Sequence, residues 1–494
     1  MSKLEYKLNV SSGTSGLALA LFLSGCSGAS DMSFAFIDKD FSEVSTSTKE
    51  IVGHEVKFFR DESERQRLSD IIDDLTGTKS VDMDTAVKIA ILNNKDVQNS
   101  LADVGIAAIK KSRSTSPQNP KFSVGVLGIG SAELGAYKAL ETLIHVDVSN
   151  AINKNRNEVI AYKELQQAKL AAILKILRVT EKTKKSWINS VYAFETLELI
   201  KNAKETADAS AELAEQLGQT GAITKAEQAK HFVFDAALSA DLAKAEVLSR
   251  NAKLKLAQVL GLANLDERFF VPDVLPKLPA EQTLLTDNMK KITEDRLDLK
   301  IMRQELEMAA EVLGIAANNS VLSNMELVIG LEKEREKHEG QIKSEITPSA
   351  EFEFTIPIFK YGKRKRKEAE FNYLKIANDF SKNALDAKAE IKSVRNTLQA
   401  SYYVARQYED HIVPLRRTIE EEALLSYNGM ITSTFELILA VRERLDADLQ
   451  NAKAKRDFFL ARANAATAQY GPGMGSNILP GEIGMSGQSG EEEH

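Results

Sequence analysis

The residues that could carry out chemistry are few and widely spaced. The chain of 494 residues contains one cysteine, Cys26, and six histidines, at positions 54, 145, 231, 338, 411 and 494. A metal site needs several ligands at short, regular spacings, and the histidines show none. No catalytic triad and no glycine-rich phosphate loop is evident. The sequence therefore predicts no enzyme, no metal site and no cofactor, and leaves the thiol of Cys26 as the one candidate for covalent chemistry.

Cys26 follows a segment with the features of a secretory signal. Lys3 and Lys7 give a basic start, an apolar run over 16–23 is too short to cross a membrane, and Leu23-Ser-Gly-Cys26 follows. The end of this segment resembles a bacterial lipobox, which implies a signal peptide over 1–25, cleavage before Cys26 and acylation of its thiol. Acyl chains anchor firmly when two or more are present. Ser27, in place of an aspartate, favours the outer membrane, whereas the alternative is a free, buried cysteine in a cytosolic protein.

Composition is typical of a packed protein rich in helix. Hydrophobic residues make up 43% of the chain, charged residues 27%, and there are only ten prolines. The net charge of −7 argues against a nucleic-acid partner. No run of 18 apolar residues occurs, so no helix is expected to span a membrane.

The same plan occurs twice along the chain. Leu217–Thr224 pairs with Leu425–Thr432 (429 − 221 = 208), and Asn93–Gln98 pairs with Asp295–Lys300 (296 − 94 = 202). We therefore predict two structural repeats that each contain a strand pair and a long helical hairpin. The predicted boundaries are a tether of irregular structure over 26–80, the first repeat over 81–262, a linker over 263–290, the second repeat over 291–470 and a disordered tail over 471–494.

The first repeat is predicted to begin with a helix, and each repeat to contain one strand pair and one hairpin of long helices. Apolar and polar residues alternate within 121–149 and 324–359, as in strands. A helix is expected from Thr85, capped by Asp84, to about Lys111. The hairpins are predicted over 151–262, with helices at 151–218 and 222–262, and over 360–470, with helices at 360–428 and 431–470. Helices of about 65 residues reach roughly 100 Å.

Local signals refine the hairpins. In 222–262, small residues recur in steps of four and three, a pattern that predicts a coiled-coil seam: Ala229, Val233, Ala236, Ala240, Ala243 and Val247. Pro414 is expected to divide its helix into two coaxial pieces. Gly221 and Gly429 are expected to end helices at the hairpin turns.

Four strands per chain are too few to close a barrel with water inside and lipid outside. The strands nevertheless alternate as such a barrel requires, and an open sheet edge cannot face lipid because its backbone groups stay unpaired. If three chains each contribute four strands, they form one closed barrel of about twelve strands, in which no sheet edge is left open. The alternative is a soluble α+β protein with an ordinary half-buried sheet.

Five short motifs in this order resemble the TolC-type outer-membrane efflux family over about residues 80–470: Ala90–Val97, Leu256–Gly261, Ile356–Lys363, Val413–Leu415 and Ser426–Thr432. The resemblance implies a mainly α fold with membrane β structure: a homotrimer with a twelve-stranded barrel and a periplasmic α-helical coiled-coil tunnel. It also implies a lipid-anchored outer-membrane channel of a tripartite efflux or type I secretion system, with a periplasmic adaptor protein and an inner-membrane transporter as partners.

The resemblance also implies where a gate and a docking surface would lie. Acidic residues that follow the second hairpin turn line the constriction of the family, and the nearest matches are Glu436 and, where a second acid is expected, Leu439. The adaptor would dock on the hairpin tips: Gly221, Ile223, Thr224, Gly429, Ile431 and Thr432. A second hypothesis is a periplasmic coiled-coil lipoprotein scaffold without a pore. Neither the cargo nor the partner pump can be deduced from the sequence.

Overall fold

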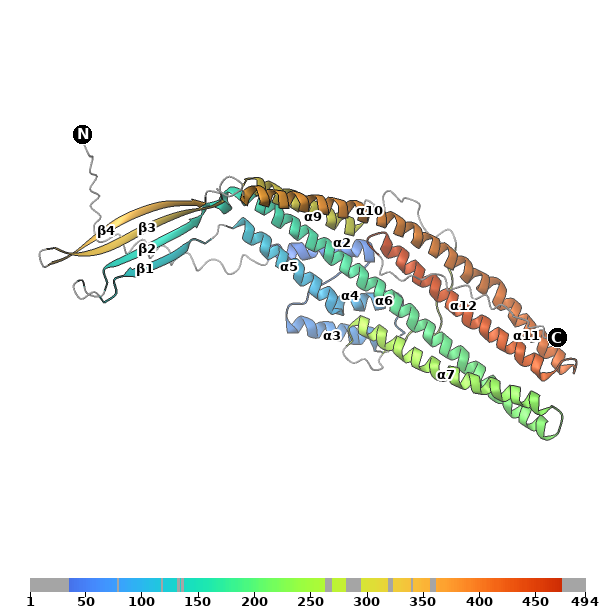
Figure 1. Ribbon diagram of the computed structural model, residues 1–494. Coiled ribbons are helices and arrows are strands. Elements are labelled where there is room, and N and C mark those ends of the chain that lie inside the picture. Colours follow the sequence, from blue (N-terminus) through green and yellow to red (C-terminus); the bar gives the residue numbers. More distant parts are fainter. Residues whose placement is uncertain are drawn as a thin grey trace.

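The computed structural model is elongated, with a sheet at one end and long helices that run away from it (Figure 1). It describes residues 35–77, 80–116, 119–130, 134, 137–262, 269–280, 295–318, 323–338, 341–355 and 361–472. Cys26, the predicted signal peptide, the segment around Pro357 and the tail from residue 473 lie outside the described residues. Across the described ranges, no helix is both long and apolar enough to cross a lipid bilayer.

The segment predicted as an irregular tether is helical. It forms α2 (Ala35–Val52) and α3 (Glu62–Thr76). Lys169 of the first long helix is buried and pairs with Asp40 at 2.5 Å and Glu43 at 2.6 Å, both on α2. The segment does lie over the body, but its helices were missed because their polar residues obscure a narrow apolar side that includes Leu68 and Ile72.

The four strands join in one antiparallel sheet of order β1-β2-β3-β4: β1 (Lys121–Leu127), β2 (Ala139–Asp147), β3 (Ser323–His338) and β4 (Gln341–Thr355). The strand pairs of the two repeats therefore meet, with Ile144 of β2 opposite Ile329 of β3. Within the described residues, the outer edges of β1 and β4 have no strand beside them. The first pair ends at Asp147, earlier than predicted, because the next helix begins at Val148.

The sheet has two chemically different faces. Residues in register on one face are apolar and exposed, among them Phe122, Val124, Ile329, Leu331 and Phe352. The opposite face is acidic, and carboxylates stand directly across from one another in the pairs Glu141–Glu332, Glu326–Glu353 and Glu334–Glu345. Like charges in register are unfavourable unless water or counter-ions surround them. The acidic face is therefore expected to contact water.

Long helices continue from the sheet. The first repeat contains α4 (Met83–Asn93), α5 (Lys95–Thr115), α6 (Val148–Gln219) and α7 (Lys225–Leu260). The second contains α9 (Leu297–Asn318), α10 (Tyr361–Gln407), α11 (Val413–Asn428) and α12 (Thr434–Ala468). The expected single helix over 85–111 is two helices, because Asn94 is extended and its side chain accepts a hydrogen bond from Asp96 N–H. Asp82, not Asp84, caps α4.

The predicted break at Pro414 is a π-helical turn. Residues Tyr408–Ile412 form this turn (η3) between α10 and α11. Pro414 lies in the first turn of α11, directly after this turn, and has no N–H to donate to a carbonyl of the preceding turn. A π turn inserts an extra residue into the helical path, so the helix continues in two pieces.

The asparagines of the first repeat cap a distant helix. The side chain of Asn93 donates to the carbonyls of Leu260, at 3.1 Å, and Gly261, at 2.7 Å, and Asn94 donates to Val259 at 2.8 Å. These carbonyls belong to the last turn of α7 and have no partner within the helix. The motifs Ala90–Val97 and Leu256–Gly261 are therefore in direct contact, although they lie far apart in the sequence.

Arg296 caps the C-terminus of the corresponding helix in the second repeat. It occupies the position paired with Asn94 and donates to the carbonyl of Ala468, the last residue of α12, at 3.3 Å. Its guanidinium is fully buried and also contacts Asp298 at 2.8 Å and Glu390 at 2.9 Å. A charged side chain thus replaces neutral amides at the equivalent helix end.

Arg296→Met is expected to destabilise the fold by about 3–5 kcal/mol, because it leaves two partly buried carboxylates without their cation. The matched control, Lys300→Met, removes a half-exposed cation 3.7 Å from Asp295, which is worth about 0–1 kcal/mol. Urea unfolding of the purified protein measures both values. Equal losses in the two variants would contradict the role assigned to Arg296.

Candidate functional site at the hairpin tips

The first tip connects α6 to α7 through a tight turn. Gly221 has φ +76°, a conformation that suits glycine, which agrees with the turn predicted there. Thr224 caps α7: its side chain accepts from Glu227 N–H at 3.2 Å, and the Glu227 carboxylate accepts from Thr224 N–H at 2.9 Å. Such a capping box fixes the start of the helix. The side chain of Thr224 is therefore already used to cap α7. Ile223 beside it is half-buried.

The second tip has the same length as the first, since four residues separate helix end and cap in both: 220–223 and 429–432. Gly429 has φ −77°, and the left-handed position is taken by Met430, with φ 54°. Gly429 ends its helix, as predicted, because it is the C-cap of α11, and Met430 takes the place that Gly221 has at the first tip (430 − 221 = 209). Met430 and Ile431 are 95% and 80% exposed, more than other apolar side chains at either tip. Thr432 has a buried hydroxyl without a hydrogen-bond partner among the described residues.

Glu436 lies in the first turn of α12 and is exposed. Its N–H donates to the side chain of Ser433, the cap of this helix, at 3.4 Å. Glu227 has the same place in α7, since 436 − 227 = 433 − 224 = 209. Acidic residues stabilise a helix N-terminus, so both glutamates have a structural reason to be there. An acidic residue therefore follows the cap at both tips.

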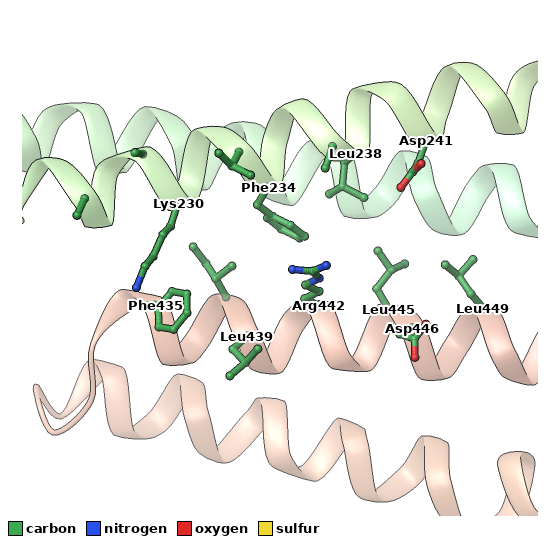
Figure 2. Close-up of a pocket in the computed structure, with 15 residues that line it drawn as sticks. Lys230, Phe234, Leu238, Asp241, Phe435, Leu439, Arg442, Leu445, Asp446 and Leu449 are labelled. Atoms are coloured by element: carbon green, nitrogen blue, oxygen red, sulfur yellow. The ribbon is translucent and has the colours of Figure 1, made fainter. Parts of the chain in front are cut away.

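Leu439 lies one turn further along α12, in a groove of about 520 Å³ between α7 and α12 (Figure 2). Figure 2 shows the facing sides of the two helices, with Phe234 and Leu238 on α7 opposite Arg442 and Leu445 on α12. The lining is apolar with a few charged groups, among them Asp241, Arg442 and Asp446. The structure therefore separates Leu439, in the groove, from Glu436, at its exposed end.

Lys230 and Phe435 join the two hairpins close to their tips. The ammonium group of Lys230 lies 3.7 Å from the centre of the Phe435 ring (Figure 2). A cation over an aromatic face contributes about 0.5–1 kcal/mol at exposed sites. Sequence reasoning missed this pair because the two residues are 205 positions apart (435 − 230) and belong to no recognisable motif.

Each hairpin is also held together internally by polar contacts. Lys204 of α6 pairs with Asp235 of α7 at 2.8 Å. In the second hairpin, Arg444 pairs with Glu420 at 2.5 Å, and Lys455 pairs with Glu409 of the π turn at 2.8 Å. These pairs set the helix register within each hairpin.

The predicted seam of α7 does not face α6. The buried residues of α7 in this stretch recur every seven positions and are His231, Leu238 and Ala245. Val233 and Val247, which belong to the predicted seam, are 68% and 59% exposed. The residues that face α6 are therefore a different set from the predicted seam, and the seam itself stays a prediction for a partner helix outside this hairpin.

His231 is a buried titratable group in the first hairpin. Its Nδ1 lies 2.7 Å from the hydroxyl of Ser210 on α6, and its Nε2 has no partner in the part of the chain that the structure describes. Burial lowers the pKa of His231 below its ordinary value of 6.5, and the nearby Glu227 carboxylate opposes this in part. The folded hairpin therefore favours the neutral imidazole.

The first hairpin is expected to lose stability in acid. Because the folded pKa lies below 6.5, the stabilisation is complete above that pH and is lost as the pH falls through 6.5 toward the folded pKa, by up to about 1.4 kcal/mol per pH unit. His231→Leu should remove this dependence, and the exposed His411→Leu should retain it. Urea midpoints at pH 7.5 and 5.0 test this, and an unchanged acid loss in His231→Leu would refute it.

Comparisons with known proteins agree at the level of fold. No protein-family model matches the chain, and no curated protein sequence matches it. The solved structures that it resembles include the Campylobacter jejuni CmeC outer membrane channel (TM-score 0.65, 17% identity, 81% of this chain and 87% of that chain). They also include the Vibrio cholerae outer membrane protein VceC (0.60, 16%, 79% and 96%) and the open state of the Neisseria gonorrhoeae MtrE outer membrane channel (0.60, 14%, 79% and 89%). The four antiparallel strands, the duplicated long hairpins and these likenesses show that the chain has the TolC-type fold of outer-membrane channel proteins.

Proposed function

We propose that the chain is the outer-membrane channel of a tripartite efflux or type I secretion system and works as a homotrimer. The observation that carries the proposal is the sheet, which has one apolar face, one acidic face and two open edges. It continues directly into α6, whose 72 residues span about 108 Å at ~1.5 Å per residue. A tube through a membrane, extended by a helical tunnel, needs these features.

Closure of the sheet supports a trimer. Unpaired backbone groups cost several kcal/mol each in hydrocarbon, so a sheet in lipid must close on itself. Four strands from each of three protomers give a barrel of about twelve, within the range of known membrane barrels. The exposed side chains of Val233 and Val247 on α7 are consistent with a neighbouring protomer on that side.

The proposed barrel would face lipid with its apolar side and water with its acidic side. An acidic wall favours cations over anions. The fold is that of channels, and transport through an open tube involves no chemistry on the cargo. Energy would therefore come from an inner-membrane transporter, linked by a periplasmic adaptor protein, and acyl chains on Cys26 would add a lipid anchor in the outer membrane.

The hairpin tips are the surface that we propose for the adaptor. Met430 and Ile431 add exposed apolar area at the second tip, which suits contact with another helix. The predicted docking residues divide into those occupied by turn chemistry, such as Thr224, and those free to contact a partner, such as Ile431. Met430 was absent from the prediction and belongs with the second group.

A periplasmic scaffold without a pore is the competing function. It would use the long hairpins but gives no reason for an exposed apolar sheet face with open edges. A scaffold would also need no acidic face opposite that apolar face. The two functions therefore differ in whether the purified protein conducts ions.

The protein extracted from membranes in detergent is expected to migrate as a trimer on unheated gels and to give single-channel currents in planar bilayers. Heating should dissociate it to monomers, because the proposed closure depends on contacts between chains. A monomer without conductance would overturn the proposal and favour the scaffold.

Glu436→Gln is expected to weaken block of the channel by polyvalent cations, because three carboxylates would surround the constriction in the trimer. Glu227→Gln is a matched control, since Glu227 has the same place in the first turn of its helix. Both variants lose a similar helix-terminal charge, so a difference in block isolates the gate. Equal block in wild type and Glu436→Gln would remove Glu436 from the gate.

A further inference from the structure

In the half of β3 that is far from the helices, acidic side chains lie on one face of the strand and basic side chains on the other. The run Glu332-Lys-Glu-Arg-Glu-Lys337 alternates acid and base, and side chains alternate between the faces of a strand. Glu332, which pairs with Glu141, and Glu334 belong to the acidic face. Lys333, Arg335 and Lys337 continue the apolar face, where Leu327, Ile329 and Leu331 precede them on the same strand. On β3 the apolar face thus becomes basic toward the end of the sheet that is far from the helices (Figure 1).

An aromatic ring lies at the same level. The guanidinium of Arg335 stacks on the ring of Tyr137, 4.0 Å from its centre, and the N–H of Arg335 donates to the carbonyl of Lys138 at 2.9 Å. Tyr137 belongs to the connection between β1 and β2. Tyrosines together with basic side chains are typical of the boundary between lipid and water, where the ring contacts acyl chains and the cation reaches the headgroups.

The height of this boundary fits a membrane. Ten residue steps separate Ser323, at the helical end of β3, from Lys333 (333 − 323 = 10). At ~3.3 Å per residue this is roughly 33 Å along the strand, or about 25 Å along the membrane normal for a strand tilted by 35–45°. That is the height of the apolar band of outer-membrane barrels. On β3, Lys333 therefore marks the level at which apolar residues give way to basic ones, while Ile346 and Ile342 of β4, opposite Lys333 and Lys337, keep apolar side chains beside the cations.

We propose that Lys333, Arg335, Lys337 and Tyr137 form a site on the outer rim of the barrel for the phosphate groups of outer-leaflet lipids. The site lies on the proposed lipid-facing side, so this inference rests on the proposed function. Across the described ranges neither Lys333 nor Lys337 has an ion-pair partner, and Lys337 is exposed. The three cations point to an anionic partner, and the apolar residues that precede them on the same face select a lipid over a soluble anion. A phosphorylated glycolipid, with two phosphates on an acylated sugar, matches both requirements.

Binding of diphosphoryl lipid A to the full-length trimer in detergent tests the site. Each basic residue near an anionic surface strengthens binding by about fivefold, so the triple variant Lys333→Gln, Arg335→Gln, Lys337→Gln is expected to bind at least tenfold more weakly. Tyr137→Leu should weaken binding to a smaller extent. Unchanged affinity in the triple variant would overturn the proposal.

Two control variants separate this site from general charge. Glu332→Gln, Glu334→Gln, Glu336→Gln changes three charges on the opposite face of the same strand and should not weaken binding. Lys363→Gln, Arg364→Gln, Lys365→Gln removes three exposed cations at the start of α10 and should bind normally. If the α10 variant lost affinity as severely as the β3 variant, binding would be unspecific attraction and the assignment would be wrong.

Channel recording and gel migration keep the two proposals distinct. If the β3 variant remains a conducting trimer and its lipid affinity is normal, only the lipid site fails. If the wild-type protein forms no conducting trimer, the proposed function fails first. Phosphate dependence is checked with lipid A from which both phosphates have been removed, and equal binding of that lipid would refute a phosphate site.

Discussion

Among the described residues no strand pairs with the outer edges of β1 and β4, and this is the constraint on which the rest of the structure depends. A four-stranded sheet with one apolar face would be unstable on its own in water and in lipid. In water its apolar side chains would be exposed, and in lipid the backbone groups of its edges would stay unpaired. Closing the sheet with further strands satisfies both. The helices obey the same requirement, since α7 exposes Val233 and Val247 on the side that does not pack within the protomer. The sheet edges and this side of α7 are therefore the surfaces that the proposed trimer would cover.

The two repeats share a structural requirement, the capping of a helix C-terminus, but meet it with different residues. In both repeats a long helix ends within the folded body, and its last carbonyls need donors. The first repeat supplies neutral amides from Asn93 and Asn94, and the second supplies the guanidinium of Arg296 with two carboxylates to balance its charge. Burial of a charge is tolerated only with such partners. Repeats that differ in sequence can therefore preserve a common architecture.

The sequence was sufficient to predict the elements that repeat a simple period over many residues. Strand alternation, helix length, the order of the landmarks and the break near Pro414 all depend on local pattern, and the structure agrees with them to within a few residues. The helices over 35–76 were missed because their apolar sides are narrow. The groove, the pair Lys230–Phe435 and the equivalence of Glu227 with Glu436 depend on contacts across more than 200 residues, about which periodicity carries no information. The lipidation of Cys26 remains a prediction.

The asymmetry of the two hairpins is now defined by backbone path rather than by charge. Both tips present a glutamate in the first turn after the cap, so an acid alone does not distinguish them. The second hairpin has Met430, instead of a glycine, at the left-handed position of its tip, and a π turn next to ion pairs that tie α12 to this turn and to α11. The first hairpin has an uninterrupted α6 with His231 buried against it. Because π turns permit local change in helix geometry, a movement that widens the tips is easier to accommodate in the second hairpin, and the contact between Lys230 and Phe435 lies where that movement would separate the two.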